Sequence, residues 1–204
     1  MNDRQSHWGK IYKTKHPEAV SWYQPSLQIS LELIQRTGLP HDAAIIDVGS
    51  GASTLVDDLL SLEYTNITLL DLSTQALELC KARLGNRANL VKWKTGDVTT
   101  AALSGFDLWH DRAVFHFFVT VAERQEYCAA LEAAVRPGGF AIIATFGPHG
   151  PMKCSGLQIQ RYSQDSLQQT LGTAFSLVTS QIEQHRTPSN VTQEFVYCLF
   201  KRAN

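Results

Sequence analysis

The 204-residue sequence lacks the features that mark several large classes of protein. Its four cysteines, Cys80, Cys128, Cys154 and Cys198, lie far apart and form no C-x-x-C pair, so we expect reduced thiols and no metal site or disulfide framework. The formal net charge of −1 provides no global attraction for nucleic acid or a membrane surface. No apolar run approaches the roughly 20 residues of a membrane span, and the polar first fifteen residues contain no secretory signal. We therefore expect a cytoplasmic protein whose partners include neither nucleic acid nor membrane.

Apolar runs and helix-like segments alternate along the chain, which predicts an α/β fold with a mostly parallel sheet covered on both faces. The strands are expected at residues 44–48, 67–70, 90–93, 106–109, 140–146, 175–183 and 194–201. The helices are expected at residues 17–37 (interrupted at Pro25), 54–62, 73–84, 122–135 and 163–171. In such sheets the ligand lies beyond the carboxyl ends of the strands.

Two glycines one residue apart, Gly49 and Gly51, directly follow the first expected strand, and Asp71 ends the second. The glycines allow the backbone to turn sharply and approach a ligand, and the acid can accept hydrogen bonds from ribose hydroxyls. The dinucleotide pattern G-x-G-x-x-G would need a third glycine where Thr54 stands. The sequence therefore favours an adenosine without a pyrophosphate, which points to S-adenosylmethionine (SAM) over NAD.

The next strand ends supply further candidate ligand contacts. Asp97 and Val98 follow the third strand, where an acid and an apolar side chain can meet the edge and face of an adenine. His110 and His116 follow the fourth and are candidate bases, because histidine titrates near neutral pH. Asp111, which lies between them in the chain, is the third candidate catalytic residue. A buried ion-paired cluster is the alternative structural reading of this segment.

The molecule that would accept the methyl group of SAM is expected to contact basic and sulfur-containing side chains. Arg112 and Arg161 can hold an anionic group by bidentate hydrogen bonds. Lys153 and Cys154 lie in a loop rich in glycine and proline after the fifth strand, and a long loop at such an edge is often functional.

The segments DVGSGAS, LLDLS, TGDV, FDLWHD and RPGGFAIIATF resemble the class I SAM-dependent methyltransferases over about residues 40–146. The resemblance implies a Rossmann-like, doubly wound, seven-stranded sheet whose last strand is antiparallel. The N-terminal HWGKIYKTKHPEAVSWYQ is similar to the W-x-x-x-Y segment of a subgroup that includes lysine methyltransferases of elongation factor 1A and citrate synthase. By this resemblance Trp8, Tyr12 and Trp22 enclose SAM, Leu72 flanks the adenine, and His110 lies beside the sulfonium.

These patterns lead us to expect one methyltransferase domain over residues 1–204. Residues 1–40 would form a helical lid, 41–146 the cofactor-binding core, and 147–204 a substrate loop, helix and closing strand pair. We expect methyl transfer from SAM, with S-adenosylhomocysteine as product, to a small molecule. A protein-lysine methyltransferase and a SAM-binding regulator without turnover are the alternatives. The lysine-directed members carry an acid and a lysine-glycine step where this chain has His110-Asp111-Arg112, which argues against a protein substrate.

Overall fold

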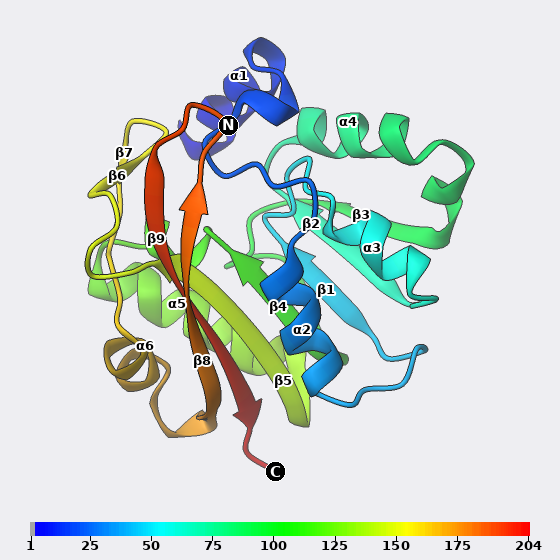
Figure 1. Ribbon diagram of the computed structural model, residues 1–204. Helices are drawn as coiled ribbons and strands as arrows, with labels where there is room; N and C mark the ends of the chain where they lie inside the picture. Colours follow the sequence, from blue (N-terminus) through cyan, green and yellow to red (C-terminus); the bar gives the residue numbers. More distant parts are fainter. Residues whose placement is uncertain (1–2) are drawn as a thin grey trace.

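The computed structural model describes residues 3–204, which are built around a seven-stranded sheet (Figure 1). The strand order is β3-β2-β1-β4-β5-β9-β8. The first five strands are mutually parallel, and β9 is antiparallel to both β5 and β8. Their bounds are β1 Ile45–Val48, β2 Ile67–Asp71, β3 Val91–Thr95, β4 Phe106–Arg112, β5 Val135–Phe146, β8 Phe175–Arg186 and β9 Thr192–Arg202. The expected Rossmann-like sheet with an antiparallel last strand is confirmed.

Five helices cover the two faces of this sheet. Helices α2 (Gln28–Arg36), α3 (Leu55–Ser61) and α4 (Thr74–Leu84) pack on one face, and α5 (Val121–Ala134) and α6 (Gln164–Leu171) on the other. The neighbouring residues Ile45 and Ile46 are both fully buried but belong to these two opposite cores. This follows from strand geometry, because successive side chains point to opposite faces.

Local hydrogen bonds explain why the helices begin where the sequence predicts. The hydroxyl of Ser73 accepts a hydrogen bond from the Ala76 backbone and begins α4. Thr120 and Glu123 form a reciprocal capping box at the start of α5. Ser163 caps α6 in the same way, so these starts depend on short-range sequence alone.

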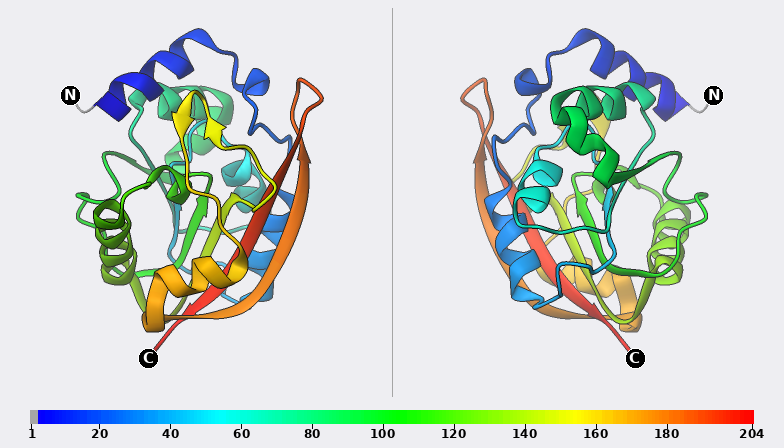
Figure 2. Two further views of the ribbon diagram at one scale, coloured as in Figure 1. Left: turned by 90° about the vertical axis from the view of Figure 1, so that its left-hand side faces the viewer. Right: turned by 90° about the vertical axis from the view of Figure 1, so that its right-hand side faces the viewer.

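The N-terminal region differs from the expected helix over residues 17–37. Only its second part is α-helical, as α2, while Pro17–Ala19 forms a short 3-10 turn (η1) and residues 20–27 are irregular. A separate helix, α1 (Asp3–Thr14), precedes them and lies across one end of the sheet (Figure 2). Two residues of the expected lid, 1 and 2, lie outside the described residues. The boundary was wrong because the prolines that restrict this stretch also separate it into independent segments.

Two of the strands that extend further than the sequence suggested change the interpretation of nearby residues. β4 continues to Arg112, so His110 and Asp111 belong to the strand and not to the loop after it. β5 begins at Val135, which pairs with Phe106 ahead of an irregularity in the ladder. Gly138, with φ of +76°, lies within that irregularity, so the Pro-Gly-Gly step bends the strand instead of ending a helix.

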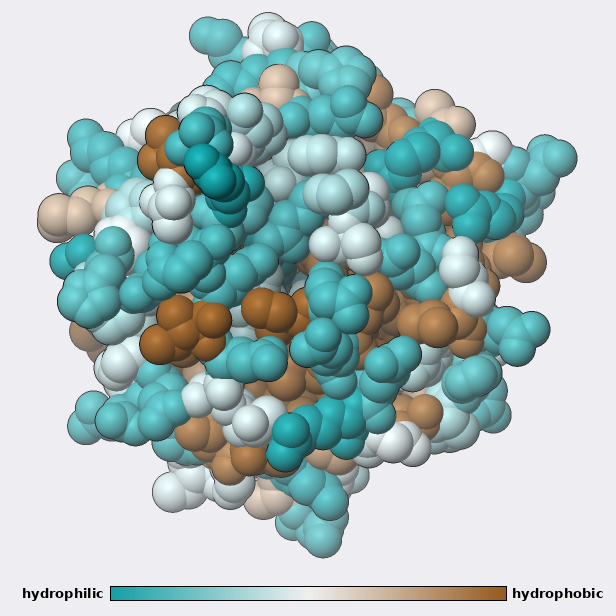
Figure 3. Space-filling model, viewed as in Figure 1, coloured by the Kyte–Doolittle hydropathy of each residue, from teal (hydrophilic) through white to brown (hydrophobic). Residues whose placement is uncertain are grey.

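The remaining elements are short. They are η2 (Gly85–Leu90), η3 (Phe115–Phe117), η4 (Gly172–Ala174) and a small hairpin of β6 (Lys153–Cys154) and β7 (Leu157–Gln158). The surface seen from the front is mostly hydrophilic, with hydrophobic residues between the polar ones (Figure 3). Within residues 3–204, no helix is long and apolar enough to cross a membrane.

Candidate active site

A pocket lies at the carboxyl ends of the parallel strands, beneath α1. Its empty volume is about 1200 Å³, part of which is open solvent at its mouth. The strand ends and the segment 4–27 contribute most of its lining. Eleven of the residues expected to contact ligand line it, namely Trp8, Tyr12, Trp22, Gly49, Asp71, Leu72, Asp97, Val98, His110, Arg112 and Cys154. Because these residues come from six separate stretches of the chain, the fold itself assembles the pocket.

The turn after β1 depends on its glycines. Gly49 and Gly51 have φ of +60° and +55°, a region that other residues adopt at a cost. A Cβ on Gly49 would lie 2.1 Å from a methyl carbon of Val114. Between the two glycines, the Ser50 hydroxyl lines the pocket, is buried, and has no hydrogen-bond partner among residues 3–204. Val114 fills the space beside Gly49 and Tyr12 the space beside Gly51, which does not line the pocket although the sequence predicted a cofactor contact there. The turn thus presents Gly49 and the unused hydroxyl of Ser50 to a ligand.

Asp71, at the end of β2, orders this turn as well as facing the pocket. One carboxylate oxygen accepts a hydrogen bond from the Gly51 backbone at 2.8 Å and the other from the Ser73 backbone at 2.7 Å. Burial raises the pKa of Asp71 to about 6, against the lowering effect of these two hydrogen bonds. Each carboxylate oxygen has two lone pairs, so both oxygens can accept one further donor, as a ribose diol requires.

The end of β3 forms the part of the pocket expected to hold adenine. Asp97 accepts two hydrogen bonds from Thr99, from its backbone at 3.0 Å and its hydroxyl at 2.8 Å. Val98 is buried beside it, and Leu72 follows Asp71 into the same lining. An acid held rigidly beside apolar side chains suits a flat ring with an amino edge.

Three aromatic residues cover the pocket from the N-terminal side. The ring of Trp8 meets those of Trp22 and Phe117 edge to face, at centroid distances of 5.8 and 5.2 Å. Tyr12 is buried, and burial raises the pKa of its hydroxyl, with the nearby Asp71 adding to the effect. Aromatic faces stabilise a nearby cation by about 0.5–2 kcal/mol, so this cover suits a positively charged ligand group.

His110 lines the pocket, but both of its ring nitrogens are engaged. Nδ1 lies 2.7 Å from the carboxylate of Asp47 and Nε2 lies 2.8 Å from the hydroxyl of Ser30. When Nδ1–H donates a hydrogen bond to Asp47, Nε2 accepts one from the Ser30 hydroxyl. His110 therefore has no lone pair free for a ligand in this arrangement, and its ring holds β1, β4 and α2 together.

The structure does not bring Asp111 or His116 to the pocket. Because β4 extends through this segment, Asp111 points to the face opposite His110 and accepts hydrogen bonds from the Val114 and Phe115 backbones and the Tyr127 hydroxyl. Burial raises its pKa to about 6. His116 is fully buried against Phe117 and Phe146, and burial lowers its pKa to about 3. Both residues are buried, as the alternative reading expected, but Asp111 is held by hydrogen bonds and His116 by aromatic packing and not by the ion pairs of that reading.

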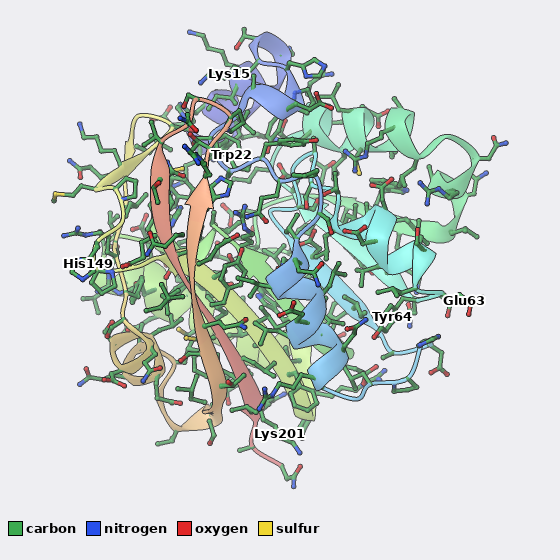
Figure 4. All side chains as sticks on the ribbon, in the orientation of Figure 1. Lys15, Trp22, Glu63, Tyr64, His149 and Lys201 are labelled. Atoms are coloured by element: carbon green, nitrogen blue, oxygen red, sulfur yellow. The ribbon has the colours of Figure 1, made fainter. Side chains whose placement is uncertain are left out.

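The expected acceptor residues are divided. Arg112 and Cys154 line the pocket and are buried, whereas Lys153 is exposed. Arg161 donates a hydrogen bond to the Gly150 carbonyl, away from the lining. His149 is exposed in the same loop, apart from Trp22 (Figure 4). Burial raises the pKa of Cys154 to about 12, so its thiol stays protonated at neutral pH.

Several residues that line the pocket or contact its lining carried no signal in the sequence. Ser30 reads as an ordinary helix residue, Val114 as one apolar residue in a loop, and Gln24 as a polar residue beside a proline. Only the tertiary contacts give them a role, and no short motif would have found them.

Comparison with known proteins agrees with this geometry. Residues 46–141 match the model of a methyltransferase domain family. A protein from a study of the conversion of a disulfide bond into a thioacetal during echinomycin biosynthesis has a TM-score of 0.76 and 18% identity, covering 98% of this chain and 91% of that one. A Burkholderia thailandensis 1,6-didemethyltoxoflavin-N1-methyltransferase, crystallised with S-adenosylhomocysteine, has a TM-score of 0.72 and 19% identity, covering 98% and 88%. Residues 46–141 of the chain thus match a methyltransferase domain, and the chain shares the fold of this methyltransferase crystallised with S-adenosylhomocysteine.

Curated relatives include EEF1A lysine methyltransferase 2 from Homo sapiens and Danio rerio. The identities are 22% over 157 residues and 27% over 145 residues, and the matches cover 69% and 67% of this chain. They span only 66% and 62% of the relatives' own length.

Proposed function

We propose that this protein transfers a methyl group from SAM to a small-molecule acceptor. The observation that carries the proposal is the Gly49–Gly51 turn, joined to Asp71 by the hydrogen bond from the Gly51 backbone and covered by the aromatic rings of α1. The orphaned Ser50 hydroxyl in the pocket lining supports a bound ligand at this turn.

Each part of the pocket has a matching part of SAM. The Gly49–Gly51 turn would hold the methionine portion, Asp71 the ribose hydroxyls, and Asp97 with Val98 the adenine. Trp8 and Trp22 would enclose the sulfonium. When bound, SAM supplies an activated methyl group: the acceptor's lone pair forms the new bond to the methyl carbon, and the electron pair of the broken carbon–sulfur bond stays on sulfur.

The chain's own contribution is positioning and exclusion of water. Well-oriented reactants can gain about 7–11 kcal/mol from positioning alone, and α1 with Trp22 closes the pocket over the strand ends. We do not propose Asp111 or His116 as bases, because neither reaches the pocket. His110 would act indirectly, because its contacts with Asp47 and Ser30 would fix the shape of the pocket floor.

The choice of a small molecule over a protein lysine is supported by charge. Arg112 puts a buried positive charge in the pocket, and the ammonium of a lysine approaching it would be repelled. The curated relatives are named as lysine methyltransferases, so a lysine acceptor is the second candidate.

Calorimetry with SAM, S-adenosylhomocysteine and NAD tests the cofactor. Binding of NAD without SAM would refute the proposal. Transfer of labelled methyl is then measured with a small-metabolite panel and, separately, with purified elongation factor 1A. Labelling of the protein alone would favour the second candidate, and SAM binding with no labelling in either assay would favour a regulator.

We also propose a cytoplasmic location. All four cysteines are free, and three of them are buried, which suits a reducing compartment. Cell fractionation checks this directly.

A further inference from the structure

Arg112 ends β4 with a guanidinium group that is held rigidly at the pocket wall. Its side chain is only 6% exposed. Nε donates to the Tyr197 hydroxyl at 2.6 Å and Nη1 to the Trp22 carbonyl oxygen at 2.8 Å. The guanidinium carbon lies 4.6 Å from the centre of the Phe195 ring. These contacts fix both the plane and the direction of the charged group.

One nitrogen of this buried group is left without a hydrogen bond. Nη2 has no partner among residues 3–204, and the nearest carboxylate oxygen, on Glu183, is 3.9 Å away. Glu183 accepts hydrogen bonds from the Tyr197 hydroxyl at 3.0 Å and from Gln24, and its 3.9 Å distance from Nη2 is too long for a hydrogen bond. A buried charged donor without a partner is costly, so a group that arrives with a ligand would satisfy it.

Apart from Arg4, which is paired with Glu123, the acidic and basic side chains of the lining occupy two separate parts of the pocket. Three acids, Asp47, Asp71 and Asp97, line the part formed by the ends of β1 to β3. Arg112 lies beside the thiol of Cys154, whose pKa it lowers slightly against the dominant effect of burial. The residues that hold Arg112 (Trp22, Glu183, Phe195 and Tyr197) all lie outside the matched family region of residues 46–141. The fixed cation is thus built by the parts of the chain added around the shared core, where acceptor specificity is expected.

We propose that Arg112 is the anion-binding residue of the acceptor subsite, and that the acceptor carries a carboxylate or a similar planar oxyanion. Nη2 and the second hydrogen of Nη1 point from one edge of the guanidinium and can donate to both oxygens of one carboxylate. The assignment of this site to the acceptor rests on the proposed methyl transfer, whereas the binding of an anion at Arg112 does not.

A carboxylate could reach Arg112 from two sources, the acceptor or the methionine part of SAM. Binding to protein already saturated with S-adenosylhomocysteine separates them, because the methionine carboxylate is then in place. The probes are benzoate and benzamide, which are matched in size and differ in charge.

Calorimetry should show benzoate binding to the saturated protein at least tenfold more tightly than benzamide. Arg112→Gln should abolish this preference, and Arg112→Lys should retain only part of it, because lysine lacks the planar fork. The matched control is Arg36→Gln, which removes an exposed arginine of α2 and should leave the preference unchanged. Melting temperatures establish that each variant is folded.

Equal binding of benzoate and benzamide to the wild-type protein overturns the proposal, even if Arg112→Gln does not fold. A tenfold loss of S-adenosylhomocysteine affinity in folded Arg112→Gln, with no benzoate preference in the wild type, assigns Arg112 to the cofactor instead. If no compound is methylated but the benzoate preference is present and depends on Arg112, the anion site stands and the proposed function fails. Where turnover is found, acids should exceed their amides in kcat/KM by at least tenfold, and Arg112→Gln should remove the difference.

Discussion

The hydroxyl of Tyr12 lies directly over Gly51, so that a Cβ at position 51 would be 2.2 Å from the hydroxyl oxygen and 3.1 Å from the ring carbon bearing it. The two residues are 39 positions apart in the printed sequence and belong to α1 and to the turn after β1. Their contact means that the N-terminal helix and the cofactor turn are built as one unit. Substitutions at either position should therefore affect both stability and cofactor affinity.

Gly51→Ala should destabilise the protein and weaken SAM binding. The new methyl group meets the Tyr12 hydroxyl, and φ of +55° is unfavourable for alanine; overpacking of this kind costs about 1–3 kcal/mol. Denaturant unfolding and calorimetry measure the two effects. In the double variant with Tyr12→Phe, which removes the nearest atom, part of the loss should be recovered.

Gly9→Ala is the matched control for that experiment. Gly9 lies in α1 with no atom within 4 Å of the added Cβ, so the same chemical change should stabilise the protein by about 0.5–1 kcal/mol through helix propensity. A loss of stability at Gly9 comparable to that at Gly51 would show that the effect is not specific to the Tyr12 contact.

Asp71→Ala should lower SAM affinity by about 1.5–3 kcal/mol, roughly ten- to hundredfold, because a charged acceptor for the ribose is lost. It should also destabilise the fold, since the Gly51 and Ser73 backbones lose their acceptor. Calorimetry and denaturant unfolding measure the two effects. Asp42→Ala, at an exposed acid, serves as the control and should change neither quantity. Unchanged SAM affinity in folded Asp71→Ala would place the ribose elsewhere.

The pH dependence of SAM binding should report the ionisation of Asp71. Burial raises its pKa to about 6, so SAM affinity should fall as pH decreases below about 6. The same rise in the pKa of Asp71 makes folding stability change with pH in the opposite direction to SAM affinity. The folded state takes up this proton before the unfolded state does, so the stability contribution of Asp71 is largest below the unfolded value of 3.8 and is lost as pH rises through about 6. In Asp71→Asn the fall in affinity below pH 6 should be absent, and its persistence would assign the effect to another group.

His116 should make the protein sensitive to acid. Burial lowers its pKa from 6.5 to about 3, so below pH 6.5 the unfolded state binds a proton that the folded state excludes. Its contribution to stability is present above 6.5 and is lost as pH falls towards 3, at up to about 1.4 kcal/mol per pH unit. Denaturant unfolding between pH 7 and 5 should show wild type losing stability relative to His116→Phe. His149→Phe, which makes the same replacement at an exposed histidine of the loop after β5, is the matched control for the burial of His116.

Helix α1 should be better protected when SAM is bound. It is held by the Arg4–Glu123 ion pair at 2.5 Å and by the Trp8–Phe117 contact, and cofactor beneath Trp8 and Tyr12 would add to these. Hydrogen exchange of residues 3–14 should slow on adding SAM, while exchange in α6, remote from the pocket, should not change. Equal exchange with and without SAM would make α1 a fixed part of the core and not a lid.

The cofactor half of the site could be predicted because its determinants are local. Gly49, Gly51 and Asp71 lie within one βαβ unit, and the turn and the parallel pairing of β1 with β2 bring them together in any fold that contains the unit. The helix caps at Ser73 and Ser163 are equally local. The mostly parallel sheet covered on both faces followed from the alternation of strand and helix, whereas the order of its strands was not predicted.

The rest of the site was decided by tertiary structure. How far β4 continues depends on its pairing with β5, and that pairing sends His110 and Arg112 to one face and Asp111 to the other. No sequence pattern contains this information, because a one-residue change of register exchanges the faces. The partners of Arg112 and His110, and the Tyr12–Gly51 contact, join residues tens of positions apart in the chain. The sequence by itself determined which cofactor the turn can hold, and only long-range packing decided which side chains lie beside it.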